Sequence, residues 1–179
     1  MNRQPFKKGL FDFVYSHGVL HHTPNTKKSF DNLPSLVKPG GTFYVAVFRK
    51  TFAPLRVLDV TLRTLLNRMP IPVLDKVCGA MSYLKALPAP MFWRTFFWYS
   101  LQHTHEVRKC CNYDWYGPRY HHEHSVEEVM GWFKDSGFSQ PKYINAWPYA
   151  PPDLKYKIPT FTDNLRLGLL LGVIGTRTR

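Results

Sequence analysis

Short apolar runs separated by glycine and proline mark the start of the chain as an alternation of strands and a helix. Leu10–Tyr15 and Thr42–Phe48 are each expected to form a buried strand, because β-branched and aromatic residues follow one another there. Asn25 is expected to cap the helix between them, which Pro34 should kink or end early. A Gly turn at Lys38–Gly41 then leads into the second strand. This order predicts a βαβ unit with parallel strands.

The pattern changes after residue 51, where apolar residues recur at the intervals of an α-helix. Pro54–Pro70 and Val73–Leu87 each place leucines or similar residues on one face, and Met91–Val107 is a third, strongly aromatic segment. Prolines mark the breaks between these segments. We therefore expect residues 51–111 to be a mainly helical insertion or lid, packed over the carboxyl ends of the two strands.

The last third of the chain begins with the clearest local signal. Ser125, with Glu128 three residues later, forms the pattern of a capping box, and Gly137 is placed to close the helix that follows. Gln140–Pro148 and Leu167–Thr178 are each expected to contain a strand. The chain thus divides into residues 1–50, the insertion at 51–111, and a C-terminal helix and strands at 112–179 that complete the sheet.

The distribution of charge adds a second constraint. The 179 residues are 44% hydrophobic, which is enough for a folded core, and they carry a formal net charge of +12. The excess lies before residue 111, where 16 basic residues stand against 5 acidic ones. A surface of this kind attracts nucleic acid, anionic lipid or an acidic ligand, although solvated lysines alone would also explain it.

Cysteine usage and hydropathy bear on the location of the protein. Cys78 and the adjacent pair Cys110–Cys111 give no disulfide framework, which favours a reducing compartment. The N-terminus lacks the continuous apolar core of a signal peptide, and no run of about 18 apolar residues occurs. We expect a cytoplasmic protein that at most lies on a membrane surface.

Histidines gather directly after the first predicted strand. The segment HGVLHHTP, His17–Pro24, contains three of them, and His121 and His122 lie shortly before the capped helix. A neutral imidazole is well matched to removing a proton near pH 7.

The stretch Phe11–Phe48 resembles the second half of a class I S-adenosylmethionine-dependent methyltransferase, in particular the enzymes grouped as methyltransferase type 11. The matching residues are Asp12, Ser16, Val19, Leu20, His21, His22 and Val37–Gly41. Asp114–Phe138 resembles the segment before the sixth strand in one branch of that family. The resemblance implies an α/β fold, namely the second half of a Rossmann-like methyltransferase sheet with a helical insertion.

The resemblance also implies where a cofactor and an acceptor would lie, since ligands of such folds bind outside the carboxyl ends of parallel strands. The residues expected to meet the methionine part of S-adenosylmethionine are Ser16, His17, Gly18, Val19 and Leu20. The predicted catalytic residues are His21 and His121. The residues expected to face a small-molecule or lipid-like acceptor are His22, Asp114, Tyr120 and His122. Loop histidines packed against a helix, and a polar corner that stabilises the insertion, are the alternative interpretation.

The Gly-rich loop and the ribose-binding carboxylate of that family have no counterpart here, and no G-x-G-x-G occurs anywhere. We therefore expect the chain to begin in the middle of the fold, as from a truncated reading frame, a wrongly assigned start or a split gene. Leu10–Tyr15 would then be an open edge, prone to self-association or to pairing with an N-terminal half. Such a chain should bind S-adenosylmethionine weakly or not at all and be inactive alone.

Two other classes of function stay open. A metal site could draw on the histidine and cysteine pairs together with His103, His105 and His124, but their spacings are not those of structural zinc sites, so no metal is expected. The basic, aromatic-rich insertion could instead make the protein a non-catalytic module that lies on an anionic membrane or binds another partner. No nucleic-acid-binding motif is present, so nucleic acid is not an expected partner.

Overall fold

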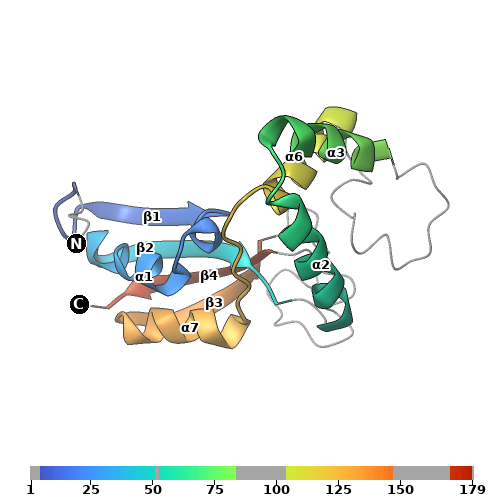
Figure 1. Ribbon diagram of the computed structural model, residues 1–179. Coiled ribbons are helices and arrows are strands. Elements are labelled where there is room, and N and C mark those ends of the chain that lie inside the picture. The colour runs from blue at the N-terminus through green and yellow to red at the C-terminus, as the bar shows by residue number, and fades with distance from the viewer. Residues whose placement is uncertain (1–4, 51–52, 84–103, 147–169, 179) are drawn as a thin grey trace. The chain divides into compact units, whose positions relative to one another are not determined.

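The computed structural model describes residues 5–50, 53–83, 104–146 and 170–178. They belong to two compact units, the first made of Met1–Thr51 and Tyr120–Arg179 and the second of Phe52–Arg119 (Figure 1). Most of the third predicted helical segment, Met91–Val107, lies outside the described residues.

A four-stranded sheet forms the centre of the first unit, with its strands in the order β1-β2-β4-β3. β1 (Phe11–His17) and β2 (Val37–Phe48) are parallel, as predicted. β4 (Leu170–Arg177) is antiparallel to both β2 and β3 (Phe138–Asn145), so the two strands predicted for the end of the chain are confirmed. Because β3 therefore runs in the same direction as β2, the carboxyl ends of β1, β2 and β3 lie at the same end of the sheet.

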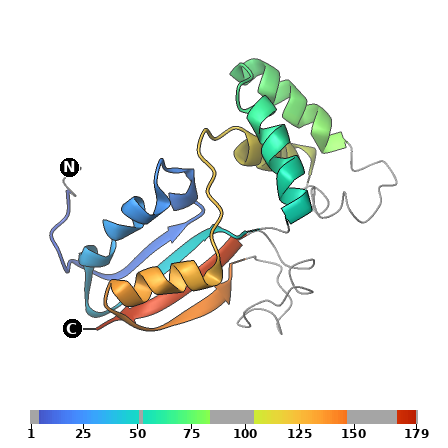
Figure 2. The ribbon, with the colours of Figure 1, turned by 60° about the horizontal axis from the view of Figure 1, so that its bottom comes forward.

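Two helices cover one face of this sheet. Figure 2 shows α1 (Thr26–Asp31) and α7 (Val126–Asp135) on the same side of the strands. The ring centroid of Phe30 in α1 lies 5.3 Å from those of Phe43 in β2 and Phe133 in α7. Buried aliphatic residues of β2 and β4 belong to the same apolar cluster. The core of the first unit thus lies between one face of the sheet and these two helices.

Capping residues determine where both helices begin, as the sequence predicts. The Asn25 side chain accepts a hydrogen bond from a backbone N–H of the first turn of α1 at 2.8 Å. Ser125 takes part in both reciprocal bonds of a capping box at the start of α7, and Gly137 follows that helix with a φ of +79°. α1 ends at Asp31, before a 3-10 turn at Pro34–Leu36, so the early end expected from the proline is confirmed.

The Gly turn predicted at Lys38–Gly41 is wrong, because these residues lie inside β2. The register shifts between Phe11 and Phe13, where one residue of β1 faces the four predicted turn residues. Gly40 has a φ of +76°, and a Cβ at Gly41 would lie 2.9 Å from a backbone carbonyl oxygen of β1. The two glycines therefore lie in a bulge within the strand, where Gly40 takes the left-handed backbone conformation and Gly41 comes too close to β1 for a side chain.

β1 is less buried than the sequence predicts. Phe13 is 54% and Tyr15 67% exposed, whereas Val14 between them packs against the core. The difference arises because α1 and α7 cover only one face, while successive side chains of a strand point to opposite faces. β1 also continues to His17, and within the described residues it pairs with β2 alone.

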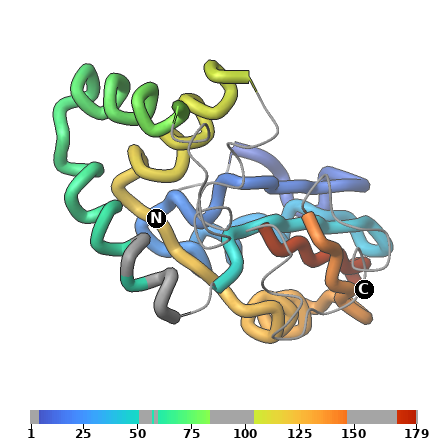
Figure 3. Tube along the Cα trace, turned by 90° about the vertical axis from the view of Figure 1, so that its right-hand side faces the viewer, coloured from blue at the N-terminus to red at the C-terminus, as the bar shows by residue number. Residues whose placement is uncertain are grey.

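The part of the second unit that the structure describes is mainly helical, in agreement with the helical insertion of the predicted fold. It contains α2 (Ala53–Leu66), α3 (Ile71–Tyr83) and α6 (His105–Tyr116), and Figure 3 shows their traces. Cys78 is fully buried in its apolar cluster, and its carbonyl accepts a hydrogen bond from the Asn112 side chain at 3.2 Å. Over the described ranges, no helix is long and apolar enough to cross a membrane.

Candidate functional site

The loop at the carboxyl end of β1 is held in a defined turn. Gly18, with a φ of +73°, leads from β1 into a 3-10 turn at Leu20–His22. Its N–H donates to the carbonyl of Ala46 in β2 at 3.1 Å, so the loop stays attached to the sheet. The Leu20 side chain is buried in the core, which leaves its backbone to meet any ligand at this end of the sheet.

A second segment, Tyr120–His124, lies along the same end of the sheet. The N–H of His122 donates to the carbonyl of His21 at 3.0 Å, and the N–H of His124 donates to that of Phe48 at 2.9 Å. These backbone bonds bring two histidine-containing segments from distant parts of the sequence together. We call His21, His22, His121 and His122 the histidine cluster.

His21 is the most buried member, with 1% of its surface exposed. Its Nδ1 accepts a hydrogen bond from the Phe48 N–H at 3.1 Å, and its ring stacks on the Phe48 ring with 3.7 Å between centroids. An acceptor nitrogen carries the lone pair, so the proton of the neutral imidazole lies on Nε2. This contact fixes the loop against the end of β2.

His22 has the opposite tautomer. Its Nδ1 lies 3.0 Å from the carbonyl oxygen of Tyr120, and because a carbonyl can only accept, Nδ1 must carry the proton. The lone pair of the neutral ring is then on Nε2. This atom is buried and has no hydrogen-bond partner among the described residues. The contact with the Tyr120 carbonyl therefore determines that the free lone pair of His22 lies on Nε2.

His121 and His122 complete the cluster. The ring centroid of His121 lies 4.5 Å from that of Phe48 and 6.1 Å from that of His22. His122 stacks on Tyr120 with 6.4 Å between ring centroids. The predicted catalytic residues, His21 and His121, are thus close together, with 6.4 Å between their ring centroids. Their catalytic roles stay predictions.

The remaining predicted site residues have other surroundings. Ser16 is half-buried at the end of β1, and Val19 is 57% exposed. His17 is exposed, and its Nδ1 lies 3.2 Å from the hydroxyl of Tyr44. Asp114 is exposed on α6 in the second unit, so its contact with an acceptor also stays a prediction.

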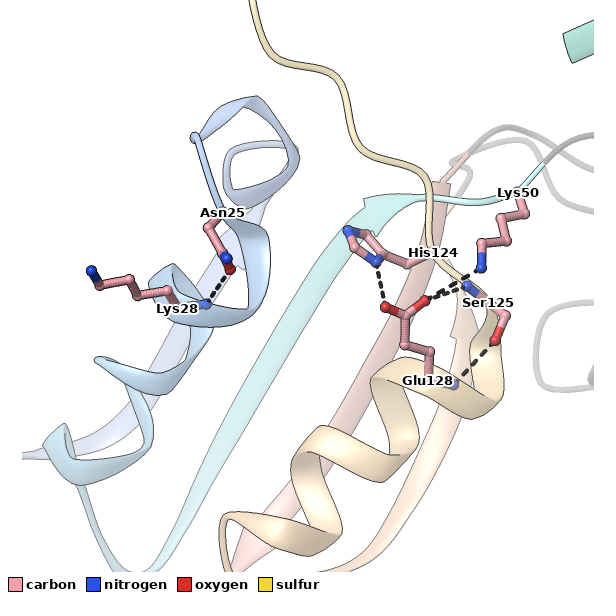
Figure 4. A network of polar contacts seen from close by, with 6 residues as sticks. All are labelled: Asn25, Lys28, Lys50, His124, Ser125 and Glu128. Atoms are coloured by element: carbon pink, nitrogen blue, oxygen red, sulfur yellow. Dashed lines mark hydrogen bonds and ion pairs between the residues drawn. The ribbon is translucent and has the colours of Figure 1, made fainter. Parts of the chain in front are cut away.

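A polar network joins the end of the Tyr120–His124 segment to the start of α7 (Figure 4). One Glu128 oxygen lies 3.0 Å from Nδ1 of His124, and the other lies 3.7 Å from Nζ of Lys50 and accepts from the N–H of Ser125. Burial lowers the pKa of His124, and Glu128 offsets this only in part. Burial alone would raise the pKa of Glu128, but the His124 hydrogen bond and charge bring it below its ordinary value.

Sequence reasoning considered His124 only as a metal ligand and missed this structural role. The available signal was its position directly before the capping serine and four residues before the capping glutamate. Residues at that separation can meet when the second one turns back toward the start of its helix. Within the ranges that the structure describes, no three His, Cys, Asp or Glu side chains lie close enough to hold a metal ion.

Two cysteines of the second unit, Cys78 and Cys111, are poorly suited to nucleophilic chemistry. Burial raises the pKa of Cys78 to about 11 and also raises the pKa of Cys111. The thiolate is the reactive form, so a raised pKa keeps both thiols protonated near neutral pH.

Comparison with known proteins points to one family. Residues 1–45 match the family model described as a methyltransferase domain, which spans β1, its loop and most of β2. The resemblance to class I methyltransferases is confirmed. The chain has an α/β methyltransferase-like fold, namely a partial Rossmann-like sheet with a helical insertion. None of the curated proteins matches this sequence.

Several solved methyltransferase structures are similar to the chain at low identity. A SAM-dependent methyltransferase from Thermotoga maritima is 13% identical, with a TM-score of 0.48, and the match covers 98% of this chain and 60% of that protein. Phosphoethanolamine N-methyltransferase 2 from Haemonchus contortus, in complex with S-adenosylhomocysteine, is 12% identical with a TM-score of 0.44, covering 97% and 35%. An O-methyltransferase family protein from Burkholderia thailandensis is 13% identical with a TM-score of 0.39, covering 95% and 31%. The chain thus spans between about a third and three fifths of these methyltransferases.

Proposed function

We propose that this chain forms the acceptor-side part of an S-adenosylmethionine-dependent methyltransferase. The observation that carries the proposal is the position of the family match. It covers β1 and the loop after it, and the carboxyl end of that strand is where the Tyr120–His124 segment adds its histidines. Ligands of parallel α/β sheets bind at this end.

The residues of the β1 loop fit one side of such a cofactor. A Cβ added at Gly18 would meet nothing within 4 Å, so space is open beside the backbone at this turn. Val19 is exposed next to it, whereas Leu20 can offer only its backbone because its side chain is in the core. We propose that Ser16, His17, Gly18, Val19 and Leu20 hold the methionine part of S-adenosylmethionine.

The histidine cluster supports a role in proton removal. When bound, S-adenosylmethionine supplies an electrophilic methyl group, and a hydroxyl or amine acceptor that takes it must give up a proton. We propose that Nε2 of His22 accepts this proton, because the Tyr120 carbonyl holds the ring in the tautomer whose lone pair lies on Nε2. We propose that His21, whose Nδ1 is bonded to Phe48, positions the loop instead of acting in the catalytic role expected from the sequence. His121 stays the second proposed catalytic residue, and His122 is proposed to face the acceptor.

The chain is proposed to act together with a Gly-rich cofactor-binding half. Its 179 residues contain no G-x-G-x-G loop to cradle the rest of the cofactor. Holding donor and acceptor in line is the main catalytic contribution available to a methyltransferase, and one loop holds only one side of the donor. We therefore propose that the chain alone binds S-adenosylmethionine weakly and does not turn over.

Substitution of Gly18 tests the cofactor assignment in a preparation that includes such a half. Gly18→Val should weaken binding of S-adenosylmethionine by about tenfold or more, because a β-branched residue is strained at a φ of +73° and the loop must rearrange. The matched control is Gly131→Ala in α7, where a Cβ meets nothing within 4 Å and the backbone is helical. Calorimetry measures the affinity of each variant for S-adenosylmethionine. Equal affinities would show that this loop is not part of the cofactor site.

A further inference from the structure

A contact between β1 and β2 lies on the face of the sheet opposite α1 and α7. Phe43 and Val45 belong to the core, so Tyr44 between them points to the opposite face. The Nδ1 atom of His17 lies 3.2 Å from the Tyr44 hydroxyl, and the two rings stack with 6.0 Å between centroids. His17, a proposed cofactor residue at the end of β1, is thus held by a residue of the neighbouring strand.

Small residues on the neighbouring strands give the Tyr44 side chain its place. Ala46 pairs with His17 on one side and with Gly172 on the other, so these three residues form a row across β1, β2 and β4. A Cβ at Gly172 would lie 3.0 Å from Cε2 of Tyr44 and 3.1 Å from its hydroxyl oxygen, as well as 2.9 Å from the carbonyl oxygen of Ile144. Tyr44 can therefore reach its diagonal neighbour His17, because the row beside it contains only an alanine and a glycine.

The chemistry of the two groups determines which of them donates. A phenol is a stronger acid than a neutral imidazole, and an imidazole nitrogen is a stronger base than a phenol oxygen. The Tyr44 hydroxyl therefore donates to Nδ1 of His17. Burial raises the pKa of Tyr44, which keeps this donor protonated over a wide range of pH. The proton of the neutral His17 ring then lies on Nε2.

We infer that Tyr44 is a positioning residue, whose hydroxyl holds His17 in the tautomer that offers its Nε2–H to the carboxylate of the methionine part of S-adenosylmethionine. A carboxylate only accepts hydrogen bonds, and an ionised acceptor strengthens the bond that an N–H donates to it. His17 is exposed, so a ligand can reach its ring. This role of Tyr44 rests on the proposed function, because His17 meets the cofactor only if the β1 loop is the cofactor site.

The tautomer of His17 can be measured in the full chain without the cofactor. Nitrogen-15 chemical shifts at about pH 8.5, above the ordinary pKa of an imidazole, should show a single tautomer with the proton on Nε2. Tyr44→Phe keeps the ring but removes the hydroxyl, and it should give a mixture of both tautomers. The matched control is Tyr15→Phe, an exposed tyrosine of β1 on the same face, which should leave the single tautomer unchanged. A mixture in the unchanged chain, or a single tautomer in Tyr44→Phe, would overturn the inference.

Calorimetry on a preparation that includes a Gly-rich half tests the contact with the cofactor. Tyr44→Phe should weaken binding of S-adenosylmethionine by about three- to tenfold, the effect of one hydrogen bond, and Tyr15→Phe should not. Binding of decarboxylated S-adenosylmethionine should be equal for Tyr44→Phe and the unchanged protein, because that compound has no carboxylate for His17 to meet. In a chain that already carries His17→Ala, Tyr44→Phe should cause no further loss of affinity.

The outcomes distinguish the role of Tyr44 from the proposed function. Equal affinity of Tyr44→Phe and the unchanged preparation for S-adenosylmethionine would overturn the role of Tyr44. Equal weakening toward the decarboxylated compound, or a further loss in the double variant, would overturn it as well. No binding of S-adenosylmethionine by the unchanged preparation would instead overturn the proposed function, and with it the contact between His17 and the cofactor.

Discussion

His124 links the histidine-containing segment to the start of α7 through its imidazole ring. Its ring packs on Trp132 with 4.9 Å between centroids, and its Nδ1 is bonded to Glu128. Its Nε2 is buried and lacks a hydrogen-bond partner among the described residues. Protonation would add a second N–H at that buried atom, which explains why the neutral form is favoured and the pKa is lowered.

The lowered pKa of His124 predicts how the free energy of unfolding depends on pH. The folded pKa of His124 lies below its ordinary value of 6.5, so the unfolded chain binds the proton more readily. The contribution of His124 to the free energy of unfolding is therefore complete above pH 6.5, and it is lost as the pH falls toward the pKa of the folded state. The lowered pKa of Glu128 adds a second loss below pH 4.5. Urea unfolding at a series of pH values measures both steps.

The matched variant for this prediction is His124→Gln, which keeps a polar side chain but cannot titrate. It should lose the first step and show a smaller second step, because His124 supplies the hydrogen bond and the charge that contribute most to lowering the pKa of Glu128. An unfolding free energy that falls equally in both proteins between pH 7 and pH 5.5 would contradict the assignment to His124.

At the scale of single residues, the sequence identified the histidines but not their contacts. The bond between His21 and Phe48 joins residues 27 positions apart, and that between His22 and Tyr120 joins residues 98 apart. Pairings of this kind depend on how the strands and loops are arranged in space. No local pattern could have distinguished the tautomers of two adjacent histidines.

At the scale of elements, the capping box of α7 gives a direct test of a local interaction. Ser125→Ala should lower the free energy of unfolding by about 0.5–2 kcal/mol, because the side chain accepts from the Glu128 N–H at 3.1 Å. Ser136→Ala, at the other end of the same helix, should change it by less than about 0.5 kcal/mol. Thermal or urea unfolding compares the two variants. Equal losses would mean that the cap does not determine where α7 begins.

Elements defined by neighbouring residues were predicted well, and those defined by distant pairing were not. Asn25, Ser125 and Pro34 act within one helical turn, so their effects can be read from the sequence. Lys38–Gly41 matches a turn just as well locally, but pairing with β1 makes it part of a strand. The exposure of Phe13 likewise depends on which face of the sheet the helices cover.

At the scale of the whole chain, the parallel pair at the start and the helical second unit followed from hydrophobic spacing, and the family followed from the motifs of the β1 loop. The division into Met1–Thr51 with Tyr120–Arg179 and Phe52–Arg119 required the fold itself, because residues far apart in the sequence form one unit. The exposure of Leu65 beside the buried Leu66 in α2 also required the structure. Periodicity showed that the helix is apolar, but not which of its leucines are covered.

The most direct test of the methyltransferase proposal is calorimetric titration of S-adenosylmethionine into two preparations. One is the chain alone, and the other is the chain joined to the Gly-rich half of a class I methyltransferase placed before residue 1. We expect no heat of binding from the chain alone and micromolar binding from the joined protein, because the β1 loop holds only one side of the cofactor. Micromolar binding by the chain alone would contradict the need for a second half, and no binding by either preparation would contradict the proposed function.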